Sequence, residues 1–111
     1  MKQLQIDGDY TSSLYDSETM LSLVTEKVVD ITDDCPSGER TILLFTRAKR
    51  GPIVQVCHPY EGHKYFGSHI HFFIAELDRN LNPRDDSFAS TAQRAGLSRW
   101  AFQQLVERAK P

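Results

Sequence analysis

Two runs of β-branched and aromatic residues, separated by a short turn, place the tightest limit on how this chain can fold. The runs read "RTILLFTR" and "PIVQVCHPY", and "AKRG" between them supplies a glycine. Such residues are enriched in strands, and two such runs around a glycine-containing turn favour an antiparallel hairpin. We expect its strands at 39–47 and 52–59. Neighbouring residues such as Ile42 and Leu43, which point to opposite faces of a strand, are both apolar, so both faces should be covered.

The size and composition of the chain fit one globular domain. Its 111 residues are 40% hydrophobic and 25% charged, which is typical of a packed protein rather than a disordered one. We expect a single domain, 1–111, with an α/β-hairpin part at 1–67 and a helical part at 68–111. The first part carries seven Lys or Arg against ten Asp or Glu, a net charge of −3, and the second carries six against five, a net charge of +1. This balance is less basic than that of most nucleic-acid-binding domains.

Two segments on either side of the expected hairpin show helical periodicity. Apolar residues recur three or four positions apart between 17 and 32, where Asp16 or Ser17 can cap a helix. A second apolar stripe runs through 68–80, with Ser68 as its candidate cap. The periodicity therefore predicts a helix in each segment.

The C-terminal segment predicts two short helices joined by a tight turn. Ser87 can cap a helix over 88–95, and Ser98 can cap a helix over 99–110. Gly96 lies between them and can adopt a positive φ without a steric clash. The expected fold class is α+β: an N-terminal helix packed on a β-hairpin, followed by a C-terminal three-helix group with a helix-turn-helix-like turn.

The last predicted helix has an apolar inner side and a polar outer side. Phe102 and Leu105 form the inner stripe. In the DNA major groove Arg pairs with guanine and Gln with adenine, and a recognition helix presents such side chains from its N-terminal half. The candidate DNA- or partner-binding residues are therefore Ser98, Arg99, Trp100, Gln103 and Gln104.

Residues from about 70 to 108 resemble the first helix-turn-helix of AraC-family transcription regulators and, less closely, the DNA-binding region of the TetR family. The segments "IAELDRNLNP", "SFASTAQRAGLS" and "RWAFQQLVERA" are similar to that family's succession of helix, polar loop, helix, turn and recognition helix. The matching positions are Ser87, Ala92, Ala95, Gly96, Leu97, Ser98 and Phe102. The resemblance implies a small bacterial transcription regulator that binds DNA through 88–110. Thr91 departs from the family, which places a buried apolar residue there.

A second class of function fits the same outer residues. Trp and Arg are frequent hot-spot residues of protein–protein interfaces. Small size and the lack of a catalytic signature suit an inhibitor or antiactivator of a transcription factor or of a defence component. The expected partner is therefore DNA or a regulatory protein. If the chain binds DNA, a homodimer is also expected, because a single helix-turn-helix of this charge binds DNA weakly.

All four histidines lie within fourteen residues, close to Cys57. They are His58, His63, His69 and His71. Zinc binds nitrogen and sulfur ligands, so a metal site is one interpretation, and exposed loop histidines are the other. The spacing matches no compact zinc pattern, and the chain has no nucleophile elbow, P-loop or paired-carboxylate motif. We therefore expect no catalytic residues, no cofactor and no bound metal.

The small number of cysteines and the short apolar runs indicate where in the cell the protein is expected. Cys35 and Cys57 are too few for a disulfide framework, which predicts two reduced thiols. No apolar run approaches 18 residues, and "MKQLQIDGDY" has no signal-peptide pattern. We expect a cytoplasmic protein without membrane contact.

Overall fold

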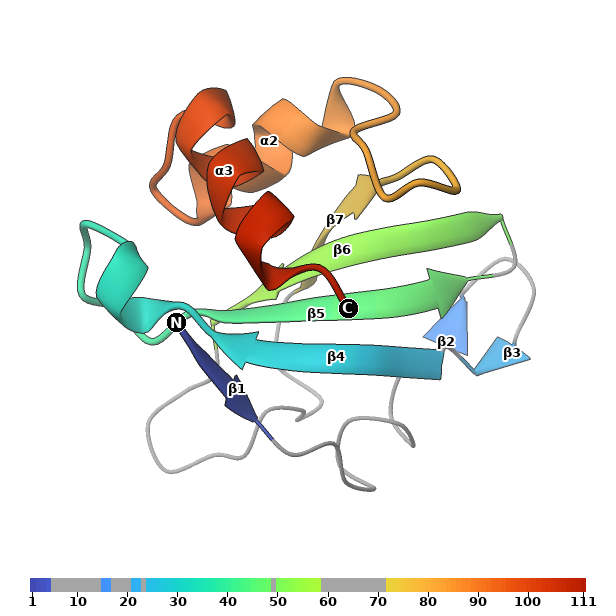
Figure 1. Ribbon diagram of the computed structural model, residues 1–111, viewed down its shortest axis with the longest axis horizontal. Coiled ribbons are helices and arrows are strands. Elements are labelled where there is room, and N and C mark those ends of the chain that lie inside the picture. Colours follow the sequence, from blue (N-terminus) through green and yellow to red (C-terminus); the bar gives the residue numbers. More distant parts are fainter. Residues whose placement is uncertain (5–14, 17–20, 23, 49, 59–71) are drawn as a thin grey trace.

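The computed structural model describes residues 1–4, 15–16, 21–22, 24–48, 50–58 and 72–111 of the chain. Within these residues the main feature is a five-stranded antiparallel sheet with the strand order β1-β4-β5-β6-β7. Its strands are β1 (Lys2–Leu4), β4 (Val24–Asp30), β5 (Ile42–Ala48), β6 (Gly51–Cys57) and β7 (Phe72–Glu76). The remaining elements are the strand pair β2 (Tyr15–Asp16) and β3 (Leu21–Ser22), the 3-10 helix η1 (Thr32–Asp34), and the helices α2 (Ser87–Arg94) and α3 (Arg99–Ala109). Both α-helices lie on the same side of the sheet (Figure 1).

The predicted hairpin is confirmed. β5 and β6 pair antiparallel from Ile42 opposite Cys57 to Ala48 opposite Gly51. The β5 residues 42–46 are all buried, so both faces of the hairpin are covered, as the sequence predicted. The hairpin does not pack on a helix at 17–32, however: residues 21–22 and 24–30 form strands, and residues 17–20 and 23 lie outside the described part of the chain.

The helix predicted over 17–32 is wrong. Asp16, proposed as its cap, lies in β2, and β4 pairs with β5 inside the sheet. The register shifts between Thr25 and Lys27 because a β-bulge displaces the alternation of side chains. This bulge hides the two-residue period of a strand and leaves apolar residues at spacings that a helix also produces. Because the segment is rich in β-branched residues, it suits the extended form.

The helix predicted over 68–80 is also wrong. Residues 72–76 form β7, which pairs with β6, and residues 68–71 lie outside the described part of the chain. Burial alternates along β7: Ala75 is completely buried on the side of the helices, whereas Ile74 is 47% exposed. Within the described residues the C-terminal helical layer is therefore α2 and α3 alone, not a three-helix group. With 8 and 11 residues, these helices are too short to cross a membrane.

The apolar core lies between the sheet and the two helices. Sheet residues in it include Val29, Leu43, Phe45, Val54, Val56 and Ala75, and helix residues include Phe88, Ala92, Phe102, Leu105, Val106 and Ala109. The ring centroids of Phe88 and Phe102 lie 5.0 Å apart, which joins α2 to α3. Burying each such ring contributes about 1.5–3 kcal/mol relative to leaving it in water. This packing holds the helix pair against the sheet.

The opposite face of the sheet is buried as well, but it contains polar groups. Its buried apolar residues include Val28, Ile42, Leu44 and Cys57. Among them lie Thr25, Thr46 and Gln55, each no more than 5% exposed. The Gln55 side-chain amide donates a hydrogen bond to Thr46 Oγ1 at 3.1 Å, which satisfies one buried donor.

Both cysteines are buried, and they are not bridged, as predicted. Burial raises the pKa of the Cys57 thiol to about 12. Burial also raises the pKa of the Cys35 thiol. The protonated, unreactive form of each thiol therefore predominates at neutral pH.

Candidate interaction surface on the C-terminal helices

A glycine-centred turn joins α2 to α3, as the sequence predicted. Gly96 has a φ of 71°. Its N–H donates to the Gln93 carbonyl at 2.9 Å, and the Leu97 N–H donates to the Ala92 carbonyl at 3.0 Å. This bond pair is the Schellman ending of a helix, in which the residue after the C-cap adopts a left-handed conformation. A Cβ at position 96 would lie 3.6 Å from Cγ of Pro36, an ordinary contact, so backbone conformation rather than space favours glycine.

Two serines stand at the helix starts, but only one of them is a cap. Ser98 Oγ accepts a hydrogen bond from the Ala101 N–H at 3.1 Å, which confirms the predicted cap of α3. Ser87 was predicted to cap α2, but it does not. Its Oγ accepts the N–H of Glu76 in β7 at 2.9 Å, while Asp85 Oδ1 accepts the Ser87 N–H at 2.9 Å. Ser87 thus fastens α2 to the sheet.

The inner and outer sides of α3 are those that the sequence predicted. Phe102 and Leu105 are buried on the inner side. The five candidate residues lie at the start of the helix, and they are Ser98, Arg99, Trp100, Gln103 and Gln104. Four of them are exposed and Gln103 is partly exposed, while Trp100 stands out with 72% of its surface accessible. The structure therefore brings these residues together on one accessible surface, which we call the α3 surface.

Arg99 is already engaged within the helix pair. Its Nη1 donates to Gln103 Oε1 at 3.2 Å, and its guanidinium carbon lies 5.6 Å from the ring centroid of Phe88 in α2. A cation over an aromatic face is attracted by the ring quadrupole. These contacts orient Arg99 along the helices, and Trp100 is the most exposed of the described large apolar side chains.

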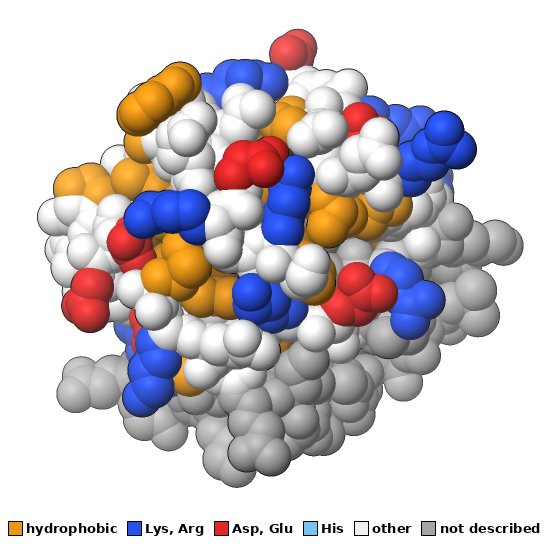
Figure 2. All heavy atoms as spheres, viewed as in Figure 1, with side chains coloured by type: hydrophobic (Ala, Val, Ile, Leu, Met, Phe, Trp, Pro, Cys, Tyr) orange, Lys and Arg blue, Asp and Glu red, His pale blue; other side chains and the backbone are white. Residues whose placement is uncertain are grey.

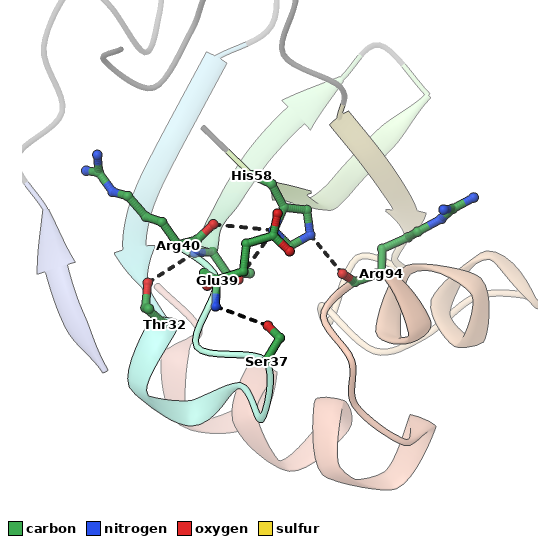
Figure 3. Close-up of polar contacts among 7 residues, drawn as sticks. Thr32, Ser37, Glu39, Arg40, His58 and Arg94 are labelled. Atoms are coloured by element: carbon green, nitrogen blue, oxygen red, sulfur yellow. Dashed lines mark hydrogen bonds and ion pairs between the residues drawn. The ribbon is translucent and has the colours of Figure 1, made fainter. Parts of the chain in front are cut away.

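His58 anchors the end of α2 to the sheet. Figure 3 shows its ring between the 37–41 segment and the last turn of α2. Nε2 lies 2.8 Å from the carbonyl oxygen of Arg94, and Nδ1 lies 3.3 Å from the carbonyl oxygen of Arg40. A carbonyl oxygen only accepts, so at the shorter of the two contacts the ring donates from Nε2 to Arg94. It thereby satisfies one of the carbonyls that a helix end leaves without an intrahelical partner.

Only one of the four histidines lies among the described residues. His58 serves the fold, whereas His63, His69 and His71 lie outside the described residues. Within the described part of the chain, no three His, Cys, Asp or Glu side chains are grouped so that they could hold a metal ion.

The helical layer is basic relative to the rest of the chain. Residues 87–111 contain four Lys or Arg against one Glu, a net charge of +3, whereas the other 86 residues contain nine against fourteen, a net charge of −5. Figure 2 shows basic and acidic side chains interspersed over the face that carries the helices, with no continuous basic stripe among the described side chains. Asp85 and Asp86 are exposed at the start of α2, and hydrogen bonds from Ser87 lower the pKa of Asp85. The positive charge of this layer is therefore modest and broken by acids.

Two contributors to this surface were not predicted from the sequence. The Phe88 ring lies under the Arg99 guanidinium, and the His58 ring hydrogen-bonds to the last carbonyl of α2. The amphipathic pattern of 88–95 indicates that Phe88 is apolar and inward, but not that it meets a residue of α3. For His58 no local signal exists, because its partner Arg94 lies 36 residues away.

The α3 surface thus combines an exposed indole, a guanidinium held over a ring, and a helix pair fixed to a sheet. No protein-family model, curated protein or solved structure matches this chain.

Proposed function

We propose that this protein is a regulatory protein-recognition module in which the α3 surface binds a partner protein, with Trp100 as the anchor. The observation that carries the proposal is the 72% exposure of Trp100 on the first turn of a helix whose inner side is buried. An indole is a large, rigid apolar group, and burial in a partner's pocket gains more from it than from other side chains. Tryptophan is accordingly among the most frequent interface hot spots.

The helix pair that carries Trp100 is fixed before any partner binds. The Gly96 turn closes α2, Ser87 bonds to β7, and His58 bonds to the last carbonyl of α2. A surface that is already ordered loses less conformational entropy on association. This rigidity supports a role in binding.

The charge of the helical layer indicates the chemistry of the partner. A net charge of +3 over 87–111, with Arg99 beside Trp100, favours an apolar pocket bordered by acidic groups. A compact module that covers such a pocket acts by blocking or adapting the partner. Inhibition or antiactivation of a regulatory protein is the function that this chemistry supports best.

DNA is a second candidate ligand, favoured by the same positive charge and by Arg99 and Gln104 in the N-terminal half of α3. Two features weigh against it. Asp85 and Asp86 are exposed at the start of α2, and the first helix of a helix-turn-helix crosses the phosphate backbone. The helix that would precede α2 in the AraC-like arrangement is instead the strand β7.

A comparison of two surface variants tests the proposal. Tagged wild-type protein, Trp100→Ala and Arg108→Gln are used to capture binding proteins from an extract of the producing cells. We expect one captured protein to be retained by Arg108→Gln, an exposed position further along α3, and lost with Trp100→Ala. Because Trp100 is the single tryptophan of the chain, its emission should then shift to shorter wavelength when a tryptophan-free version of the purified partner is added.

A parallel measurement decides between the two ligand classes. Fluorescence polarisation with a mixed-sequence DNA duplex at low salt reports binding to the backbone. We expect no saturable binding. Duplex binding that Arg99→Ala abolishes and Trp100→Ala leaves intact would replace the protein-binding proposal with the DNA-binding one.

A further inference from the structure

In the described part of the sheet β7 is the last strand in the order, and no described strand pairs with its side away from β6. The Leu77 N–H donates to the Pro52 carbonyl at 3.0 Å, so Leu77 directs its backbone groups toward β6. In an antiparallel pair, successive residues direct these groups to opposite sides. Phe73 and Ala75 therefore also bond toward β6, whereas Ile74 and Glu76 direct their N–H and C=O groups outward.

Part of this edge is closed by the start of α2. The outward N–H of Glu76 donates to Ser87 Oγ at 2.9 Å, and its outward carbonyl accepts from the Arg84 N–H at 3.1 Å. At Ile74 the edge is different: none of the described residues hydrogen-bonds to its outward N–H or C=O, and the residue is about half exposed. Ile74 therefore offers a donor, an acceptor and an apolar side chain together.

A hollow of about 300 Å³ lies beside this position, between β7 and α2. Its lining includes Phe73, Ile74, Ser90, Thr91 and Arg94. Arg94 is the one charged residue among these, and its guanidinium carbon lies 4.5 Å from the ring centroid of Phe73. The hollow is thus lined by apolar side chains, by two residues with hydroxyl groups, and by the Arg94 guanidinium, which lies over the Phe73 ring.

We propose that the edge of β7 at Ile74 binds an extended peptide segment of a partner protein by strand addition, with an acidic side chain in the hollow beside Arg94. An added strand takes up the outward N–H and C=O of Ile74. Its side chains alternate between the two faces of the sheet. One therefore enters the hollow, where the Arg94 guanidinium, which pairs with no described acidic side chain, selects a carboxylate. The neighbouring peptide side chains lie beside the exposed Ile74 side chain, which selects apolar residues.

This peptide site is separate from the α3 surface and goes beyond the function proposed for it. It uses the strand edge and the last turn of α2 rather than Trp100. Trp100→Ala should therefore bind the peptide as the wild type does. The two proposals can fail independently, because the assay below needs no native partner.

The probe is the synthetic peptide acetyl-Thr-Val-Glu-Val-Thr-amide, with Lys in place of Glu as its matched control. Binding is followed by NMR of the 15N-labelled full chain. We expect the Glu peptide to shift the Ile74 amide signal in a saturable manner and the Lys peptide to bind at least about tenfold more weakly, since a charge-assisted hydrogen bond is lost. Arg94→Glu should reverse this preference, and Arg79→Gln, at another exposed arginine, should not change it.

A backbone variant tests the strand geometry. Ile74→Pro breaks no hydrogen bond to β6, because the Ile74 N–H points outward, a position where an edge strand accepts proline. We expect it to retain the thermal midpoint within a few degrees and lose the Glu peptide, while Ile74→Val keeps both. If Ile74→Pro does not fold, the reversed preference of Arg94→Glu for the Lys peptide still tests the proposal.

Three outcomes overturn the proposal. The first is equal binding of the Glu and Lys peptides, and the second is the absence of any shift at the Ile74 amide. The third is self-association of the wild type in sedimentation that Ile74→Pro abolishes, which would make a second copy of this chain the occupant of the edge.

Discussion

The two faces of the sheet are both buried, but their chemistry differs. The face under α2 and α3 is filled by aliphatic and aromatic side chains, while the opposite face holds Thr25, Thr46 and Gln55 among its aliphatic residues. The helix-covered face depends on shape and apolar area, whereas the opposite face depends also on each buried polar group finding a partner. The helix-covered face fixes the position of the α3 surface. On the opposite face, the buried polar side chains need hydrogen-bond partners to remain buried.

The largest expected effect comes from the helix-covered face. Phe102→Ala removes a completely buried ring that packs on Phe88, and it should lower the free energy of unfolding by about 3–5 kcal/mol. Urea denaturation followed by circular dichroism measures this loss. A loss below about 1 kcal/mol would mean that α3 is not part of the cooperative core.

The opposite face should respond to the loss of a hydrogen bond rather than of volume. Thr46→Val keeps the shape but leaves the Gln55 amide without its acceptor, at an expected cost of about 1–3 kcal/mol. The double variant Thr46→Val/Gln55→Leu should recover part of this loss, because no unpaired donor remains. A double-mutant cycle gives the coupling, and strict additivity of the two changes would contradict a hydrogen-bonded pair.

A smaller effect is expected at the turn of the helical layer. Gly96→Ala should cost about 1–2 kcal/mol, because an L-residue at a φ of 71° is strained although a Cβ has room there. Gly96→Asn should cost less, since asparagine tolerates this conformation better. Thermal denaturation ranks the two variants, and the reverse order would point to a steric cause instead.

The smallest effect should come from the outermost apolar residue of the same layer. Trp100→Ala should change the free energy of unfolding by no more than about 0.5 kcal/mol, because most of the indole surface is in water already. Denaturation by urea, run beside Phe102→Ala, provides the matched comparison on one helix. A cost approaching that of Phe102→Ala would mean that Trp100 stabilises this fold rather than serving a partner.

The parts of the fold that the sequence predicted are those with local signals. The β5–β6 hairpin follows from two strand-forming runs around a glycine turn, and α2 and α3 follow from their apolar stripes. The start of α3 and the turn before it were also predictable, because Ser98 bonds three residues ahead and Gly96 bonds three residues back. The outer position of Arg99 and Trp100 then follows from the 3.6-residue period of the helix.

The parts that were wrong depend on partners distant in the chain. β4 is a strand because β5 pairs with it, and its bulge at Thr25–Lys27 disguises the strand period. β7 is a strand because β6, more than a dozen residues earlier, offers its free side. The sequence of 72–76 fits an apolar helical stripe equally well, so the choice was not local.

By itself, the sequence determined the hairpin, the two C-terminal helices, the glycine turn between them and the exposure of Trp100, because short-range hydrogen bonds and side-chain periodicity decide each of these. Only the tertiary structure decided that 24–30 and 72–76 are strands, that His58 caps α2, and that Ile74 lies near Arg94 on the side of β7 that no described strand covers. Those features depend on contacts between residues far apart in the chain. Burial against the sheet outweighs the weak local preference for a helix.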